Sequence, residues 1–347
     1  MPNHVALSDE QNEAVTELLS SRRPVQTLGG YAGTGKTTVI RTLHEELPGY
    51  APMAFTGKAA HVLRKKDILA STIHSAIYYP RHKKGRQAEF VLREEIECNG
   101  FIVDEASMVS ENLFDDLMSF NKPIIFVGDH GQLEPVGDKF DLMKTPDVTL
   151  QTVHRNAGEI AYFAEYVRNG GDPAYWKGTG EQVQIVNTSE MSIEDLMEHD
   201  QFICAYNKTR VAVNKDVRKL KGFPARKPVL NDRVMCLRNN HTLGVFNGMQ
   251  GFVSSVPTGK FDFASDGQIY HVEYTPRQFN KASKPEFVPK DKTIPFDYCY
   301  AITCHKAQGD EWDSVMVLEQ KCKLWDHKRW AYTAASRARE KLTWVCD

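Results

Sequence analysis

Short strand-like runs alternate with helix-like segments through the first half of the chain. One helix-like segment begins at Ser8, where Ser-x-x-Gln places Gln11 in a capping-box pattern, and another covers 37–47. The runs between them are short and apolar, as in parallel strands that are buried on both faces. This alternation predicts an α/β sheet with ligand-binding groups at the strand ends. The strand-like runs are 25–28, 51–56, 100–103 and 123–127.

The region 227–295 has a different pattern, in which β-branched and aromatic residues alternate with polar ones. Three dipeptides ending in glycine interrupt it, which is typical of antiparallel strands joined by tight turns. Since apolar runs of the first kind return after Pro295, we expect a small β barrel or sandwich inserted into a second α/β domain. The turns are Asn247-Gly248, Thr258-Gly259 and Asp266-Gly267, and the later runs are 298–303, 314–318 and 342–346.

The segment 78–95 is short and polar, with a basic centre at 81–86. It fits either a solvated loop or a β-hairpin projecting from the first domain. Composition alone favours the loop.

Length and composition limit the classes of protein that the chain can represent. Its 347 residues suggest two domains, and 41% hydrophobic with 25% charged residues excludes a disordered chain. The 43 basic and 45 acidic residues give a net charge of −2, so bulk charge does not indicate a polyanionic partner. A basic stripe can still exist on a neutral protein.

Targeting signals and disulfide frameworks are not expected. No apolar run is long enough to span a membrane, and the N-terminus lacks the apolar core of a signal peptide. The seven cysteines are scattered, odd in number and form no C-x-x-C pair. They indicate buried thiols in a reducing cytoplasm rather than disulfides or a zinc site.

The sequence GYAGTGKT at 30–37 matches the phosphate-binding pattern G-x-x-x-x-G-K-[ST] in full. It lies between a strand-like run and a helix-like segment, which is the context that the pattern requires. Glycines let successive main-chain N–H groups turn toward phosphate oxygens at a helix N-terminus. Lys36 would reach the β- and γ-phosphates, and the Thr37 hydroxyl would bind Mg²⁺. The motif glycines are Gly30, Gly33 and Gly35.

Two further strand ends carry polar groups that suit nucleotide hydrolysis. Asp104 and Glu105 follow the run 100–103, so Asp104 would hold Mg²⁺ and Glu105 would act as general base or position the water. Gln132 follows the run 123–127 and would hydrogen-bond the γ-phosphate.

The order and spacing of many short motifs resemble superfamily 1 helicases, and specifically the 1B branch that contains the RecD and Dda proteins. The resemblance covers almost the whole chain. Its motifs I, Ia, Ib, II, III, IV, V and VI match 30–37, 55–60, 71–74, 104–107, 128–133, 150–155, 301–309 and 332–339, and 204–214 resembles a Dda-type segment.

Three departures accompany this resemblance. Cys304 in motif V and Ser336 in motif VI replace a small aliphatic residue and a threonine, and we expect both changes to be conservative. The segment 78–95 is far shorter than the insertions of the UvrD-like branch, which supports the 1B branch and favours a hairpin over a loop.

The resemblance implies two RecA-like P-loop motor domains, at 1–155 and 156–347, with ATP at their interface. It makes 78–95 a pin hairpin inserted into the first domain and 227–295 an SH3-like β insertion in the second. Roles in nucleotide binding and hydrolysis come with it. Gln11 would read adenine, Thr38 and Gly309 would contact the nucleotide, Arg155 would contact the γ-phosphate and Arg337 would be the arginine finger.

A nucleic-acid track over both motor domains is also implied. Hydroxyl, lysine and histidine groups suit contacts with phosphate and sugar that read no base. Phe90 in the hairpin is the candidate for stacking at a duplex junction, although packing within the hairpin is an alternative. The other candidates are Thr56, Lys58, His61, Thr72, His74, Asn207, Thr303 and His305.

The sequence thus predicts an ATP- and Mg²⁺-dependent DNA helicase that moves 5′→3′ on a single strand. Its expected partners are single-stranded DNA, single-strand–duplex junctions and replication or recombination proteins. We expect an intracellular monomer without membrane contact, and the short chain suggests a phage or mobile-element source. The alternatives are a translocase or remodelling motor without unwinding activity, a motor subunit of a nuclease complex, and a nucleotide-gated single-strand clamp.

Overall fold

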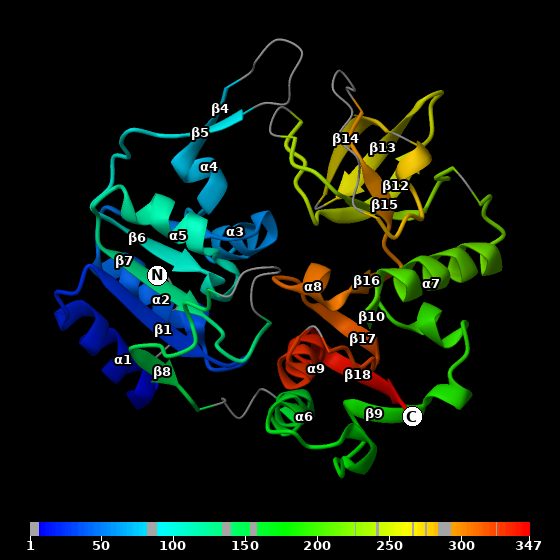
Figure 1. Ribbon diagram of the computed structural model, residues 1–347, viewed down its shortest axis with the longest axis horizontal. Helices are drawn as coiled ribbons and strands as arrows, with labels where there is room; N and C mark the ends of the chain where they lie inside the picture. The colour runs from blue at the N-terminus through cyan, green and yellow to red at the C-terminus, as the bar shows by residue number, and fades with distance from the viewer. Residues whose placement is uncertain are drawn as a thin grey trace. The chain divides into compact units, whose positions relative to one another are not determined.

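Two parallel β-sheets organise the chain, one in each of its two structural units in the computed structural model (Figure 1). Unit 1 comprises the described residues of Met1–Lys83, Ala88–Arg168 and Lys328–Thr333, and unit 2 the remainder. The structure describes residues 7–81, 89–133, 140–152, 158–225, 227–240, 243–265, 267–274, 276–283, 293–323 and 325–347.

The sheet of unit 1 has six strands in the order β3-β2-β6-β7-β1-β8, and all neighbours are parallel. Because parallel strands share one direction, their carboxyl ends lie along one edge of the sheet. The strands are β1 (Val25–Gly30), β2 (Tyr50–Ala54), β3 (Ser71–Thr72), β6 (Gly100–Asp104), β7 (Ile124–Gly128) and β8 (Val148–Leu150).

Apolar side chains cover both faces of this sheet. In β6, Ile102 joins the core that includes the helices α1 and α2, whereas Phe101 and Val103 join the core that includes α4 and α5. Strands buried in this way are mostly apolar on both faces, which explains the nearly continuous apolar runs in the sequence. The helices are α1 (Asp9–Ser20), α2 (Lys36–Glu46), α3 (Gly57–Arg64), α4 (Ile73–Ile77), α5 (Glu111–Met118) and α6 (Gly158–Arg168).

Unit 2 contains a five-stranded parallel sheet in the order β16-β10-β17-β18-β9. The strands are β9 (Val183–Asn187), β10 (Gln201–Cys204), β16 (Ala301–Thr303), β17 (Trp312–Leu318) and β18 (Ala338–Cys346). The accompanying helices are α7 (Asn207–Leu220), α8 (Cys304–Ala307) and α9 (His327–Ala335), of which Lys328–Thr333 belongs to unit 1.

A second sheet of unit 2, which we call the inserted sheet, lies between α7 and β16 in the sequence. Its five strands are antiparallel in the order β14-β13-β12-β11-β15. Phe261, Phe263 and Phe296 of this sheet belong to the same apolar core as Phe202 of β10, so the inserted sheet is packed into its unit. The strands are β11 (Arg233–Cys236), β12 (Gln250–Ser255), β13 (Lys260–Ser265), β14 (Gln268–Glu273) and β15 (Phe296–Tyr298).

A short antiparallel hairpin pairs β4 (Tyr78–Arg81) with β5 (Glu89–Leu92). It falls within the segment 78–95, for which composition alone favours a loop and the family resemblance favours a hairpin. Its use as a pin at a duplex junction stays a prediction.

The predicted α/β class is confirmed, and so is the capped first helix. Ser8 Oγ accepts from the Gln11 N–H, and Gln11 Oε1 accepts from the Ser8 N–H. The strand expected over 298–303 is wrong in one respect. Tyr298 ends β15 of the inserted sheet, and only Ala301–Thr303 joins the parallel sheet. An apolar run cannot reveal this division, because both segments are fully buried.

Three observations complete the description of the chain. The expected turns are glycines in the left-handed region, with φ of 90° at Gly248 and 75° at both Gly259 and Gly267, while Asp266 lies outside the described residues. None of the seven cysteines, all of which lie in the described ranges, forms a disulfide. Within the described ranges, no helix has both the length and the apolar character needed to cross a membrane.

A buried ion pair anchors the inserted sheet to α7. Arg218 contacts both carboxylate oxygens of Asp232 at 2.9 Å, and both side chains are almost fully buried. The Tyr300 hydroxyl donates to the same carboxylate, and the guanidinium lies 3.8 Å from the centre of the Tyr298 ring. The pair thus joins the helix, the start of β11 and the segment around β15.

The Asp232→Ala variant would leave the Arg218 charge buried without its carboxylate. We expect the free energy of unfolding to fall by about 3–5 kcal/mol, measured by urea unfolding followed through tryptophan fluorescence. Glu273→Ala is the matched control, because its pair with Lys260 is about half exposed and is worth at most about 1 kcal/mol. Equal losses in the two variants would contradict the anchoring role.

Candidate functional site

The carboxyl edge of the unit 1 sheet brings together the predicted nucleotide residues of this unit. β6, β7 and β1 are neighbours in the sheet, and they end at Asp104, Gly128 and Gly30. The phosphate-binding pattern follows β1, and Asp129 follows β7. Three motifs that are far apart in the sequence therefore meet at one edge because of strand order alone.

The start of α2 differs from that of the neighbouring helices. Side-chain hydroxyls of Ser8, Thr56, Thr72 and Ser110 cap α1, α3, α4 and α5. By contrast, α2 begins after Gly35, which has a φ of 82° and no side-chain cap, and its first turn contains no acidic residue. A helix that starts in this way presents main-chain N–H groups and a positive dipole end to an anion.

The Lys36 side chain folds back onto the phosphate loop. Its ammonium donates to the carbonyl oxygens of Gly30 at 2.8 Å and Tyr31 at 3.0 Å, and it is 4.0 Å from Asp129 Oδ2. Gly33, with a φ of 80°, supplies the second left-handed turn of the loop. The Thr37 hydroxyl makes no hydrogen bond to the described residues, which leaves it available to a cation.

Asp104 and Glu105 end β6 in an unusual local conformation. Burial raises the pKa of the Asp104 carboxyl, while the Glu105 N–H and the Lys36 charge oppose this effect. Glu105 has a φ of 57° and a ψ of 39°, a left-handed conformation that is rare outside glycine. Such strain costs about 1–3 kcal/mol and is found mainly at functional sites.

Asp104 and Thr37 fit a Mg²⁺ ion that is held mainly by substrate phosphates and water. Among the described residues, no group of three or more His, Cys, Asp and Glu side chains forms a metal cage. Mg²⁺ usually keeps several waters and binds one or two carboxylates together with substrate phosphates. The half-buried carboxylate of Asp104 together with the Thr37 hydroxyl matches that requirement.

Gln132 is 5% exposed and is held by Asp129. Its Nε2 donates to Asp129 Oδ2 at 3.2 Å, and the Gly131 N–H donates to Asp129 Oδ1. Gln132 Oε1 is buried without a hydrogen-bond partner within the described part of the chain. An amide oxygen without a partner, close after the end of β7, is suited to accept a hydrogen bond from a bound water.

Sequence reasoning missed the aromatic side chains that fix this loop. The Tyr332 hydroxyl accepts from the Ala32 N–H at 2.8 Å and donates to Asp129 Oδ2 at 2.7 Å. The Arg168 guanidinium lies 3.5 Å from the centre of the Tyr31 ring. Tyr332 is the first residue of motif VI, and this is the only feature of the sequence that points to it. Arg168 lies in no motif.

The Gln11 side chain contacts the phosphate loop. Its Nε2 donates to the Thr34 carbonyl at 3.0 Å, and the side chain is 4% exposed. The same amide thus caps α1 and fixes the loop. Its contact with adenine stays a prediction.

The predicted nucleotide residues of unit 2 are Gly309 and Arg337. Gly309 has a φ of 77°, and Arg337 is 3% exposed and donates to the Asp310 carbonyl and the Ser336 hydroxyl. Arg155 lies outside the described residues.

The residues predicted to contact single-stranded DNA lie on several helices and strands. Thr56 and Thr72 begin α3 and α4, where their hydroxyls already accept from main-chain N–H groups. His305 is half-buried, its ring lies 5.3 Å from that of Trp325, and burial lowers its pKa. Phe90 is 44% exposed, with its ring 6.5 Å from that of Tyr78.

The remaining predicted contacts differ in exposure. Asn207 accepts from Arg210 at the exposed start of α7, and Thr303 is 8% exposed at the end of β16. Lys58 is exposed on α3, and His61 on the same helix has a buried Nε2 without a partner among the described residues. His74 on α4 lies 6.2 Å from the Phe55 ring, measured between ring centres.

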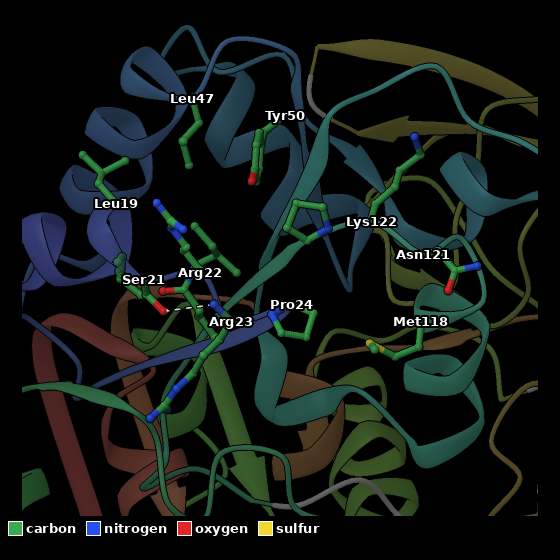
Figure 2. A pocket seen from close by; sticks show the side chains of 14 residues that line it. Leu19, Ser21, Arg22, Arg23, Pro24, Leu47, Tyr50, Met118, Asn121 and Lys122 are labelled. Atoms are coloured by element: carbon green, nitrogen blue, oxygen red, sulfur yellow. Dashed lines mark hydrogen bonds between the residues drawn. The ribbon is translucent and has the colours of Figure 1, made fainter.

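A separate hollow of unit 1 lies at the opposite edge of the sheet, where β1 and β7 begin (Figure 2). Arg22, Tyr50 and Lys122 are among its lining residues, and none of the residues around it belongs to the motifs. Because ligands of open parallel sheets bind at the carboxyl ends of the strands, this hollow is not the candidate nucleotide site.

Comparison with protein families gives two matches. The sequence model of the AAA-domain family matches residues 6–188, and that of the UvrD-like helicase C-terminal domain matches residues 298–345. The first match covers more than half of the chain.

Similar curated proteins include a DNA helicase and a conjugal transfer protein. The chain is 27% identical to the ATP-dependent RecD2 DNA helicase of Deinococcus radiodurans over 97% of its length and 48% of that protein. It is 26% identical to the probable conjugal transfer protein TraA of Sinorhizobium fredii, over 98% of the chain. The chain spans 32% of the length of TraA, about a third.

Solved Pif1 helicases share the fold. A Bacteroides Pif1 in complex with ADP-AlF3 and single-stranded DNA has a TM-score of 0.64 at 20% identity, covering 98% of this chain and 92% of that one. Pif1 from Candida albicans has a TM-score of 0.59 at 19% identity, covering 99% and 95%.

The Tyr332→Phe variant would remove one hydroxyl that serves both Ala32 and Asp129. We expect the free energy of unfolding to fall by about 1–3 kcal/mol, measured in urea, because buried polar groups would lose their partner. Tyr162→Phe is the control, since Tyr162 is 57% exposed, and it should change stability by less than about 0.5 kcal/mol. A Tyr332→Phe protein as stable as the control would show that the hydroxyl does not hold the loop.

Proposed function

We propose that this chain, which belongs to the AAA-domain family, is a RecD- and Pif1-like helicase of superfamily 1B, an ATP-dependent DNA helicase that moves 5′→3′ on single-stranded DNA. The observation that carries this proposal is the carboxyl edge of the unit 1 sheet. There the uncapped start of α2 adjoins Lys36, Asp104, Glu105 and Gln132.

The phosphate loop would bind the nucleotide through main-chain groups and one ammonium. Gly33 and Gly35 turn the loop so that the first N–H groups of α2 face the phosphates. Lys36 would exchange the Gly30 and Tyr31 carbonyl oxygens for phosphate oxygens, a stronger interaction because both partners are charged. Gln11, Gly30, Thr38 and Gly309 complete the proposed nucleotide contacts.

Hydrolysis would use the carboxylates and the amide at the neighbouring strand ends. Thr37 and Asp104 would hold Mg²⁺, which supplies charge neutralisation at the phosphates. Glu105 would accept the proton of the attacking water, and Gln132 Oε1 would orient that water. We assign to Arg155 and Arg337 the stabilisation of charge on the transferred phosphoryl group.

The DNA track is proposed on chemistry that does not read sequence. Its hydroxyl, lysine and histidine groups suit phosphate and sugar oxygens, and the exposed Phe90 ring can stack on a base. Similar proteins support this assignment, since Pif1 has been solved with single-stranded DNA. The track residues are Thr56, Lys58, His61, Thr72, His74, Phe90, Asn207, Thr303 and His305.

The Lys36→Ala variant tests the phosphate assignment. We expect ATP turnover in the presence of single-stranded DNA to fall by about 10²–10³-fold, because a charge that stabilises the transition state is lost. Turnover is measured as phosphate release, with Lys144→Ala as the control because this exposed lysine belongs to no motif. Full turnover by Lys36→Ala would refute the assignment.

Unwinding of tailed duplexes tests the helicase itself. With ATP and Mg²⁺, the protein should separate a duplex carrying a 5′ single-stranded tail and leave one with a 3′ tail paired, as strand separation on a gel would show. Lys36→Ala separates neither duplex if hydrolysis drives the motion. Separation of only the 3′-tailed duplex would reverse the polarity, and DNA-stimulated hydrolysis without separation would indicate a translocase.

A further inference from the structure

We propose that Gln250 and Asp310 are positioning residues for Arg337, through which the inserted sheet sets the rate of ATP hydrolysis. Gln250 begins β12, and Asp310 lies between α8 and β17. The inference rests on the proposed role of Arg337 in hydrolysis. It adds a specific path within unit 2 from the inserted sheet to that guanidinium.

The first step of the path is the main chain around Asp310. Arg337 NH1 donates to the Asp310 carbonyl at 3.1 Å, and the Trp312 N–H donates to the Arg337 carbonyl at 2.9 Å. Residues 310–312 therefore hold Arg337 at both its side chain and its main chain. A shift of the Asp310 carbonyl would redirect the guanidinium, because that hydrogen bond is one of the contacts that orient this side chain.

The second step is the side chain of Asp310. It is 5% exposed, and its Oδ2 accepts from Gln250 Nε2 at 3.0 Å. A buried carboxylate requires hydrogen-bond donors, so this contact determines where Asp310 lies. The Gln250 main chain is itself fixed, because it pairs with Met235 and its carbonyl accepts from the Ser265 hydroxyl at 2.6 Å.

A second contact joins the same two segments. Lys306 Nζ in α8 donates to Asn247 Oδ1 at 2.8 Å, three residues before Gln250. The inserted sheet and its β11–β12 connection thus hold Lys306 in motif V and Asp310 directly after it. Thr303 and His305, proposed strand contacts, lie on the same short segment. Movement of that segment on DNA would therefore reach Arg337, and the inserted sheet would limit its extent.

The test exchanges the donor and the acceptor of the Gln250–Asp310 hydrogen bond. Gln250→Glu places a second carboxylate against Asp310, so the hydrogen bond is lost. The double variant Gln250→Glu with Asp310→Asn restores it, with the amide at position 310 donating to the carboxylate at position 250. We expect Gln250→Glu to lower kcat of DNA-stimulated ATP hydrolysis by about tenfold to a hundredfold, as expected for a misplaced catalytic group. KM for ATP should change by less than about twofold, because nucleotide binding is not altered.

Matched variants separate positioning from folding. The double variant should recover at least half of the wild-type kcat, and Gln250→Met, which is uncharged and of similar length, should behave as Gln250→Glu does. Gln268→Glu is the control, since it makes the same change on exposed β14 of the same sheet. Melting temperature is measured for each variant, so that a folding defect is recognised.

The outcomes distinguish the inference from the function on which it rests. Wild-type kcat in Gln250→Glu and Gln250→Met, or a double variant that recovers its melting temperature but not its kcat, overturns the positioning role alone. Unchanged kcat in Arg337→Ala overturns the role of Arg337 and the inference with it. Absence of DNA-stimulated hydrolysis in the wild-type protein overturns the proposed function as well.

Discussion

The candidate nucleotide site depends on a helix that begins without a cap. Main-chain N–H groups at a helix start need a partner, and α1, α3, α4 and α5 each supply one from a serine or threonine hydroxyl. At α2 the position is held by Gly35 in a left-handed conformation, which has no side chain to offer. An anion can accept hydrogen bonds from the main-chain N–H groups at this helix start. The other residues of the candidate site lie around that position.

Parallel strand order then determines which side chains surround that anion. β1, β7 and β6 are neighbours although long segments separate them in the sequence, so Lys36, Asp129 and Asp104 meet at one edge. Apolar cores on both faces of the sheet hold this edge in place. Ile102 packs in one core, while Phe101 and Val103 pack in the other. Rigid placement matters because charged groups stabilise a transition state only when they are already oriented.

Sequence reasoning predicts features that are local in the chain. The capping box of Ser8 and Gln11, the strand before Gly30 and the helix after Gly35 each depend on residues within a few positions of one another. The contacts of Tyr332 with Ala32 and of Gln250 with Asp310 span 300 and 60 residues, and no local pattern encodes them. For the same reason the apolar run 298–303 does not reveal that Tyr298 belongs to the inserted sheet and Ala301–Thr303 to the parallel sheet.

Unsatisfied polar atoms show where the fold gives up stability. Ser107 Oγ, His130 Nδ1 and Gln132 Oε1 are buried without hydrogen-bond partners in the described part of the chain, and all three follow β6 or β7 at the carboxyl edge. Each such atom costs about 1–3 kcal/mol, and the left-handed Glu105 adds a similar cost. In the parallel sheet of unit 1 these costs fall on residues that follow the strands, and not on the described residues of the strands themselves. A ligand that supplies the missing partners would recover part of this energy on binding, so the same atoms that weaken the free protein would favour its nucleotide-bound state.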